Sequence, residues 1–264
     1  MHKRQSLIVH IGAGILFLEI FFCSLGNKAL ASIPQRPFVV IIDPGHGGSD
    51  NGALGTFGVV KYYEKNITLA LAIRVKRLLE NPKYWGTLGQ KIKVVLTRNS
   101  DATVSLEDRT KIAQTQKPDL FLSIHTNAEN SGTARGVETF FLNNTNGSER
   151  KIAEISKKKH NSDMDLLLSA VAADANVGPS KEAAEIIHQS VLQHMKVFNH
   201  TAVNRGVKQD LLYVLLDAHV PSVLFEGLFI TNQDDLQLLS QPKGRETIAD
   251  GLANGILRFL VRRE

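Results

Sequence analysis

Four side chains with the chemistry of metal ligands or proton carriers stand at the ends of expected strands or at the start of an expected helix. They are His46, Glu64, His125 and Glu226. In an open α/β sheet the carboxyl ends of the strands share one edge, so residues distant in sequence can meet there. Two imidazoles and one carboxylate are the ligand type of catalytic zinc, which keeps a fourth position for water. His46, Glu64 and His125 are therefore candidate metal ligands, and Glu226 is a candidate base.

Local sequence leaves a plainer interpretation of His46 open. The stretch Gly45-His46-Gly47-Gly48 is equally typical of a surface turn. The separations of 18 residues from His46 to Glu64 and of 61 more to His125 add no support for a metal site, and there is no H-E-x-x-H motif. The glycine-rich turn also lacks the Lys-Ser/Thr of a phosphate-binding loop, so nucleotide binding is not expected.

The other histidines are not expected to bind metal. His188 and His194 are six residues apart on one expected helix, about 240° around its axis, so they cannot share an ion. His160, His200 and His219 fall in expected loops or element ends and are expected to be solvated.

The hydrophobic pattern alternates between strand and helix signals. Strands are expected at 38–42, 92–96, 119–124, 137–142, 211–216 and 222–225, and helices at 64–79, 105–116, 182–198, 232–239 and 245–262. The segment 143–180 gives no regular pattern. The alternation predicts an α/β fold: a single domain with a mainly parallel twisted sheet and helices on both faces.

The first residues are expected to be a targeting segment rather than part of the fold. Residues 1–31 combine a basic start, an apolar run and a small-x-small ending at Ala31, which is typical of an export signal. Glu19 interrupts the run, so an uncleaved anchor is the alternative. The only cysteine, Cys23, lies in this segment, which excludes a cysteine nucleophile from a processed chain. The segment predicts an exported protein of the periplasm or cell envelope.

The rest of the chain, residues 36–264, has the length of one domain. The full sequence has 264 residues, 43% of them hydrophobic, which is enough to form a core. A formal charge of +5 invites a polyanionic partner, but only 6% of the residues are aromatic, so no nucleic acid is expected among the partners.

Taken together, a series of ordered motifs closely resembles the zinc-dependent N-acetylmuramoyl-L-alanine amidases of cell separation and sporulation. The match spans roughly Phe38 to Leu260. The motifs are Val39–Gly48, Glu64-Lys65-Asn66-Ile67, Leu96-Thr97-Arg98, Asp119–Ala128, Gly136–Thr139, Arg205–Gln209 and Pro221–Glu226.

The resemblance implies that His46, Glu64 and His125 bind Zn²⁺ and that Glu226 is the catalytic carboxylate. It implies peptidoglycan as the substrate, cleaved at the amide between N-acetylmuramic acid and the L-Ala of the stem peptide. One departure concerns the backbone after Glu226: the family usually has Glu-Leu-Gly-Phe, and here Glu226-Gly227-Leu228-Phe229 moves the glycine forward by one position.

Regulation and support of the site are less determined by the sequence. In some relatives a helix covers the metal until a partner lifts it, and the region 148–174, with a helix-compatible stretch at 148–159, is the corresponding candidate here. An exposed helix that touches nothing is the alternative.

Asp43 and Asn127 are close enough in sequence to support the histidines, although each is equally explained as a turn residue.

Two other functions are compatible with the same residues. A zinc carboxypeptidase or endopeptidase acting on wall peptides would share the metal chemistry, although it normally carries different ligand motifs. A catalytically silent wall-binding or division protein would share the fold, although the complete set of four candidate residues argues against it.

Overall fold

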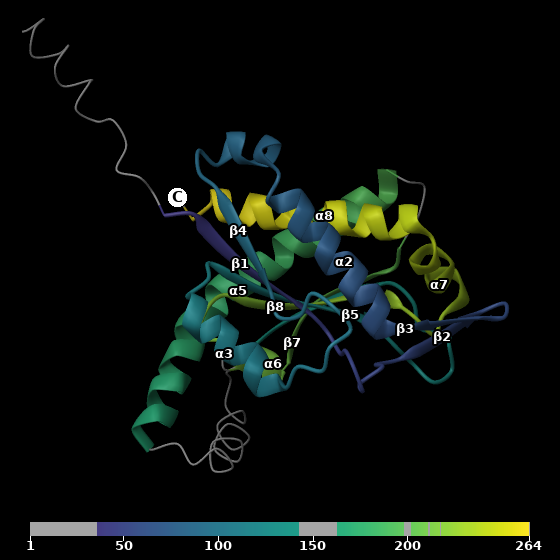
Figure 1. The fold of residues 1–264 in the computed structure, drawn as a ribbon, viewed down its shortest axis with the longest axis horizontal. Coiled ribbons are helices and arrows are strands. Elements are labelled where there is room, and N and C mark those ends of the chain that lie inside the picture. Colours follow the sequence, from purple (N-terminus) through teal and green to yellow (C-terminus); the bar gives the residue numbers. More distant parts are fainter. Residues whose placement is uncertain (1–35, 143–162, 198–201, 211, 217, 264) are drawn as a thin grey trace, which may run out of the picture. The chain divides into compact units, whose positions relative to one another are not determined.

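The computed structural model describes residues 36–142, 163–197, 202–210, 212–216 and 218–263. The expected export signal at 1–31 and the helix-compatible stretch at 148–159 lie outside these residues. Pro37–Glu264 forms one compact unit, and its ribbon is shown in Figure 1. No helix among the described residues is both long and apolar enough to cross a bilayer.

A six-stranded sheet forms the middle layer. Its order is β4 (Ile92–Leu96), β1 (Phe38–Pro44), β5 (Leu120–Asn127), β8 (Ser222–Phe229), β6 (Val137–Leu142) and β7 (Asn204–Asp210). Neighbouring strands are parallel except β6 and β8, which are antiparallel. The carboxyl ends of β1, β5 and β8 therefore lie at the same edge of the sheet as the amino end of β6.

Helices cover both faces of the sheet, because the central strands are apolar on both sides. On one face lie α2 (Glu64–Leu79), α5 (Asp163–Val197) and α8 (Pro242–Val261), and on the other lie α3 (Leu106–Gln116) and the short α6 (Tyr213–Leu216). A further helix, α7 (Gln233–Ser240), joins β8 to α8. The predicted fold class is confirmed.

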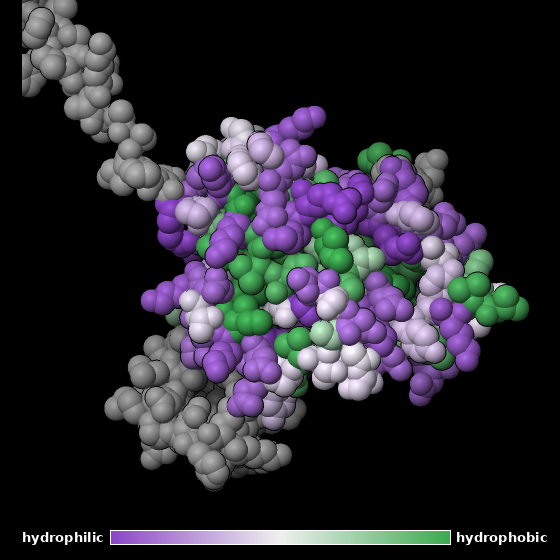
Figure 2. All heavy atoms as spheres, in the orientation of Figure 1, coloured by the Kyte–Doolittle hydropathy of each residue, from purple (hydrophilic) through white to green (hydrophobic). Residues whose placement is uncertain are grey.

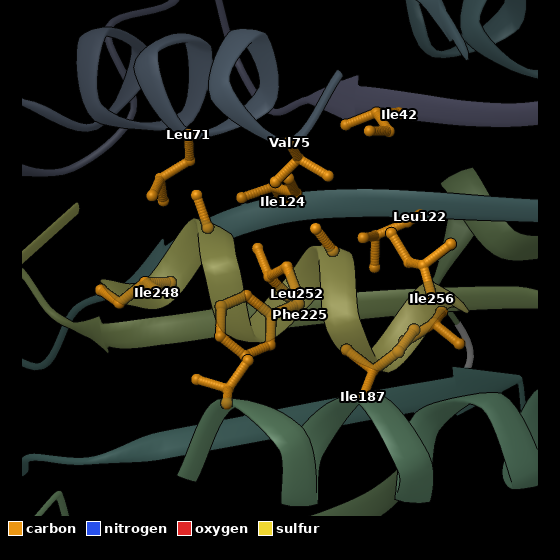
Figure 3. Packing of buried hydrophobic residues seen from close by; sticks show 14 of the residues in the cluster. Ile42, Leu71, Val75, Leu122, Ile124, Ile187, Phe225, Ile248, Leu252 and Ile256 are labelled. Atoms are coloured by element: carbon orange, nitrogen blue, oxygen red, sulfur yellow. The ribbon is translucent and has the colours of Figure 1, made fainter. Parts of the chain in front are cut away.

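The larger core lies between the sheet and the layer of α2, α5 and α8 (Figure 3). Leu71 of α2 and Leu252 of α8 point into it with Phe225 of the sheet, and each is at most 1% exposed. Two glycines let α8 approach α5: a Cβ added at Gly251 or Gly255 would lie 2.7 Å from a backbone Cα of α5. This packing holds the layer of α2, α5 and α8 against the sheet, and α2 begins at Glu64.

Several parts of the architecture differ from the sequence-based prediction. Helix α5 begins at Asp163, whereas the sequence predicted a helix only over 182–198. The expected strand at 211–216 is wrong, because Tyr213–Leu216 forms the helix α6. The edge strand β7 was not predicted, since its sequence is polar and it has no fully buried residue. A hairpin of β2 (Leu54–Phe57) and β3 (Val60–Tyr63) and a 3-10 helix (Pro82–Thr87) were also missed, since short, exposed elements give no hydrophobic period.

The hairpin leads directly into α2. Its tip is apolar and open to solvent, with Val59 97% exposed, and Figure 2 shows green side chains at this end of the molecule. Its inner side packs closely on the chain that follows β8, since a Cβ added at Gly55 would lie 2.2 Å from the carbonyl oxygen of Ile230. The hairpin, which leads into α2 along the chain, therefore also packs against the segment that follows β8.

Candidate active site

The structure brings together His46, Glu64 and His125. Their candidate ligand atoms all lie within 4.8 Å of one another. Glu64 stands between the two imidazoles, with Oε2 3.0 Å from His46 Nε2 and Oε1 3.0 Å from His125 Nδ1. The two rings meet edge to face with centroids 4.8 Å apart. Among the described residues, this is the group of His, Cys, Asp and Glu side chains whose geometry could hold a metal ion.

Glu64 is held in place by its position at the start of α2. Its carboxylate accepts hydrogen bonds from the backbone N–H of Ala53 at 2.9 Å and of Thr126 at 3.1 Å. Burial would raise the pKa of Glu64, but the hydrogen bonds and charges of His125 and His46 outweigh burial and lower this pKa far below its usual range. The carboxylate is therefore ionised and aimed at the histidines.

His46 sits in the loop after β1 with a left-handed backbone, φ 61°. Its Nδ1 lies 2.8 Å from Asp50 Oδ2, which orients the ring so that Nε2 faces Glu64. Burial lowers the pKa of His46, but Glu64 and Asp50 together outweigh it and raise the pKa to about 9. Asp50 supports His46 in the way that carboxylates commonly support metal-binding histidines.

Two buried arginines, Arg98 and Arg109, hold the backbone of this loop. Arg98 donates from Nε to the carbonyl oxygen of Pro44 at 3.0 Å and from Nη2 to that of Gly45 at 2.7 Å. Arg109 donates from Nη2 to the carbonyl oxygen of His46 at 2.8 Å. Three consecutive carbonyl groups are thus fixed by guanidinium donors, which stabilises the unusual backbone of His46.

Asp43 and Asn127 do not support the histidines. Asp43 is 1% exposed and accepts hydrogen bonds from Arg109 Nη1 at 2.5 Å, Thr97 Oγ1 at 2.5 Å and Ser123 Oγ at 2.8 Å. Asn127 caps its own loop by accepting from the next backbone N–H at 2.9 Å. Sequence reasoning missed Asp50, for which the four-residue spacing after His46 in a glycine-rich turn was the available signal.

Two glycines leave space for the candidate metal-binding side chains. A Cβ added at Gly45 would lie 2.2 Å from Cε1 of His125, and one added at Gly52 would lie 2.7 Å from both Glu64 Oε2 and a ring carbon of His46. No larger residue fits at either position without moving a candidate ligand. Gly45 and Gly52 therefore leave the room that the three side chains occupy.

Glu226 of β8 lies beside this group. It is the register partner of His125 on β5, so both side chains project from the same face of adjacent strands. Its Oε2 is buried and has no hydrogen-bond partner among the described residues. Burial raises the pKa of Glu226 to about 7, an effect that His125 opposes and that the negative charges of Glu64 and Glu138 reinforce.

The shifted glycine after Glu226 has a visible consequence. The pairing of β5 with β8 slips between His125 and Asn127, where β8 carries an extra residue. In this bulge Leu228 adopts φ 72°, a left-handed conformation that glycine would adopt at little cost. The strain, on the order of 1–3 kcal/mol, lies two residues from Glu226. The side chain of Leu228 is fully buried, which anchors it there.

The remaining described histidines do not belong to the candidate metal-binding group, as expected. His188 is 1% exposed and bridges Thr139 Oγ1 at 3.0 Å to Asn204 Oδ1 at 2.8 Å. His194 bonds the carbonyl oxygen of a residue one turn earlier in its helix. The prediction that His219 is solvated is wrong, because this residue is half-buried and its Nε2 is buried. His160 and His200 lie outside the described residues.

Comparison with known proteins identifies the family of this chain. A family model described as N-acetylmuramoyl-L-alanine amidase matches residues 40–258. The chain is 33% identical over 231 residues to N-acetylmuramoyl-L-alanine amidase AmiA of Escherichia coli, covering 84% of this chain and 75% of AmiA. The chain belongs to the N-acetylmuramoyl-L-alanine amidase family.

Solved structures agree with the fold of this family member. An N-acetylmuramoyl-L-alanine amidase from Clostridium difficile superposes with a TM-score of 0.65 at 27% identity, covering 86% of this chain and 98% of that one. The CwlD amidase from Clostridioides difficile, solved in complex with the GerS lipoprotein, gives a TM-score of 0.63 at 25% identity, covering 84% and 98%. The amidase resemblance expected from the motifs is thereby confirmed.

Proposed function

We propose that this chain is a zinc-dependent peptidoglycan hydrolase that cleaves the amide between N-acetylmuramic acid and the L-Ala of the stem peptide. His46, Glu64 and His125 hold the metal, and Glu226 carries the proton. The observation that supports this most directly is the convergence of three ligand atoms within 4.8 Å beside a buried, unpartnered carboxylate oxygen, in a chain of the amidase family.

The residues present fit a zinc ion. Two imidazole nitrogens and a carboxylate oxygen are donors that zinc accepts, and three protein ligands leave the open position that a catalytic site needs. The two carboxylate oxygens of Glu64 each lie 3.0 Å from an imidazole nitrogen, and Gly45 and Gly52 keep the space around the three side chains free. A bound zinc ion would polarise the amide carbonyl and make a water molecule more acidic.

The protein supplies the remaining steps. Glu226 accepts the proton of the attacking water and returns it to the leaving nitrogen, which must be protonated before the carbon–nitrogen bond breaks. Its unpartnered Oε2 is free for this proton. Asp50 and Glu64 fix the orientation of His46, and the arginine-supported loop keeps its backbone in place.

The sharpest test removes the proton carrier but keeps the metal site. We expect both the wild type and Glu226→Gln to bind one zinc ion per chain, and we expect Glu226→Gln to release no stem peptide from purified sacculi. The measurements are metal content by atomic emission and mass analysis of soluble products, with and without chelator. A fully active Glu226→Gln protein would remove Glu226 from this role.

The products separate this activity from the two alternatives. An amidase releases intact stem peptides that begin with L-Ala, whereas a carboxypeptidase releases only terminal D-Ala. A silent wall-binding protein releases neither, and its association with sacculi would be insensitive to chelator.

The cellular role proposed here is wall remodelling and cell separation outside the cytoplasm, in the periplasm or cell envelope, after export directed by residues 1–31. Peptidoglycan is then the partner substrate of the catalytic domain at 36–264. Fractionation and N-terminal sequencing of the native protein test this, since a cleaved chain begins after Ala31 and an anchored one keeps its leader.

A protein activator is also proposed, acting through the region 148–174. The solved complex of the CwlD amidase with a lipoprotein supports the general idea of a protein partner in this family. Deleting residues 148–174 is expected to raise the basal hydrolysis of sacculi. Unchanged basal hydrolysis in a folded deletion variant would exclude autoinhibition by this region.

A further inference from the structure

Polar side chains continue across the sheet beyond Glu226. Glu138 of β6 is the register partner of Glu226 on β8, so the two carboxylates project from the same face of adjacent strands. Next in the sheet comes β7, where Arg205 and Lys208 both bind Glu138. A row of polar and charged side chains therefore crosses the neighbouring strands β5, β8, β6 and β7 in that order. It runs from His125 through Glu226 and Glu138 to the two cations.

The two cations are partly exposed, although the carboxylate that they share is buried. The side chain of Glu138 is 6% exposed, whereas those of Arg205 and Lys208 are 35% and 41% exposed. Arg205 contacts Glu138 through Nε, and among the described residues its two Nη groups make no hydrogen bond. One carboxylate cannot neutralise two cations, so this end of the row keeps a net positive charge and a free guanidinium edge.

The backbone of β7 is shaped to aim Arg205 at this position. Val137 pairs with Asn204 but Thr139 pairs with Val207, so β7 carries an extra residue opposite Glu138. Gly206 takes φ 85° in this bulge, and bulges of this kind commonly re-aim side chains beside active sites.

Buried contacts keep the bulge in place. Asn204 Oδ1 accepts from the N–H of Gly206 at 2.9 Å and lies 2.8 Å from Nε2 of the buried His188. The guanidinium of Arg205 also lies over the ring of Phe229, 5.1 Å from its centroid, which orients its plane. Arg205 is thus held by a built structure rather than left as a mobile surface cation.

We propose that Arg205 and Lys208 form a subsite for a carboxylate of the stem peptide. The inference rests on the proposed amidase function, which places the scissile amide beside Glu226. The glycan side of that amide is uncharged, since the carboxyl group of muramic acid is consumed in the amide itself. A peptide has at least a terminal carboxylate, so a cationic subsite selects the peptide side.

The dimensions of the sheet indicate how far along the peptide this carboxylate lies. Neighbouring strands are about 4.8 Å apart, so β7 lies roughly 10 Å from β8. An extended peptide advances about 3.4 Å per residue, so the bound carboxylate belongs to about the third residue or its neighbour after the scissile amide. The free guanidinium edge of Arg205 suits a carboxylate, which arginine binds with two parallel hydrogen bonds.

The test compares two substrates on three proteins. The substrates are a muramoyl peptide with free carboxylates and the same peptide with each carboxylate converted to an amide; the proteins are the wild type, Arg205→Gln and Arg262→Gln. The control residue Arg262 is an exposed arginine that pairs with Glu182 on the helical layer. Arg262→Gln removes one positive charge, as Arg205→Gln does, but at a position outside the row of side chains.

The expected result is a selective loss. Arg205→Gln should raise KM for the free-carboxylate substrate on the order of tenfold, because a hydrogen bond between charged groups is lost, with kcat within about twofold. Its KM for the amidated substrate should stay unchanged, and Arg262→Gln should match the wild type on both. Equal losses on the two substrates, or none, would overturn the subsite, because a merely structural role of Arg205 does not distinguish them.

Binding to an inert protein separates this inference from the proposed function. Calorimetry measures the affinity of Glu226→Gln, with and without Arg205→Gln, for the free-carboxylate substrate. A tenfold loss of affinity caused by Arg205→Gln supports the subsite, whether or not the wild type is active. A wild type that hydrolyses nothing would refute the amidase proposal but not the subsite. An unchanged affinity refutes the subsite even if the wild type is an active amidase.

Discussion

Gly45→Ala tests whether the position of His125 is set by the space that a glycine leaves. Gly45 does not have a positive φ, so alanine is compatible with its backbone. The added Cβ would lie 2.2 Å from Cε1 of His125, 2.4 Å from Nε2 and 2.6 Å from Nδ1, whereas ordinary contacts begin at 3.4 Å. The ring must therefore withdraw by about 1 Å, well beyond the roughly 0.2 Å that metal–ligand distances tolerate.

The consequence should be larger for function than for folding. We expect zinc affinity to fall by at least about tenfold and hydrolysis of sacculi by on the order of a hundredfold, since misplacement of a catalytic group by 1 Å has effects of that size. Zinc affinity is measured by competition with a chromophoric chelator, and hydrolysis by dye release from labelled sacculi. Urea unfolding of the metal-free protein reports stability separately.

Gly86→Ala is the matched control. Gly86 has nothing within 4 Å of its Cβ position and no positive φ, so the same substitution there should leave zinc affinity and hydrolysis unchanged. If Gly45→Ala bound zinc and hydrolysed sacculi within twofold of the wild type, the inferred packing of His125 against Gly45 would be refuted.

Three further predictions address the surroundings of the site. Asp50→Asn should weaken zinc binding about tenfold in chelator competition, because the support of His46 loses its charge; an unchanged affinity would contradict this. Arg109→Met should lower the free energy of unfolding in urea by about 3–5 kcal/mol, because it leaves Asp43 buried without its ion-pair partner; a loss under about 1 kcal/mol would argue against that pair. Burial raises the pKa of Glu138, but the hydrogen bonds from the two cations of β7 outweigh burial and lower this pKa. The ionised carboxylate therefore stabilises the fold fully above the ordinary pKa of 4.5, and this stabilisation is lost as the pH falls through the lowered pKa. The stability difference between the wild type and Glu138→Gln should therefore shrink from about pH 6 to about pH 3 in urea unfolding, and a constant difference would contradict the assignment.

Much of the fold follows from local sequence because its central strands are strongly apolar. The run that became β1 is apolar enough to be buried on both faces, and helix α2 shows a clear period from Ile67 to Leu79. The strand β7 escaped prediction for the opposite reason: at the sheet edge it has no fully buried residue, so its sequence carries no such signal. The stretch 211–216 is apolar but too short for periodicity to distinguish helix from strand.

The sequence determined by itself which residue types are available at strand ends: His46, Glu64, His125 and Glu226 were all named from local pattern and motif resemblance. Only the tertiary structure decided that the first three meet within 4.8 Å and that Glu226 stands opposite His125 in the sheet register. It also decided the partners of the site, assigning Asp50 rather than Asp43 to His46. The physical reason is that side-chain identity is local, whereas distance, burial and register arise from contacts between residues far apart in the sequence. His125 and Glu226 pair in the sheet across 101 positions, and helix α2 packs with α8 from the other end of the chain.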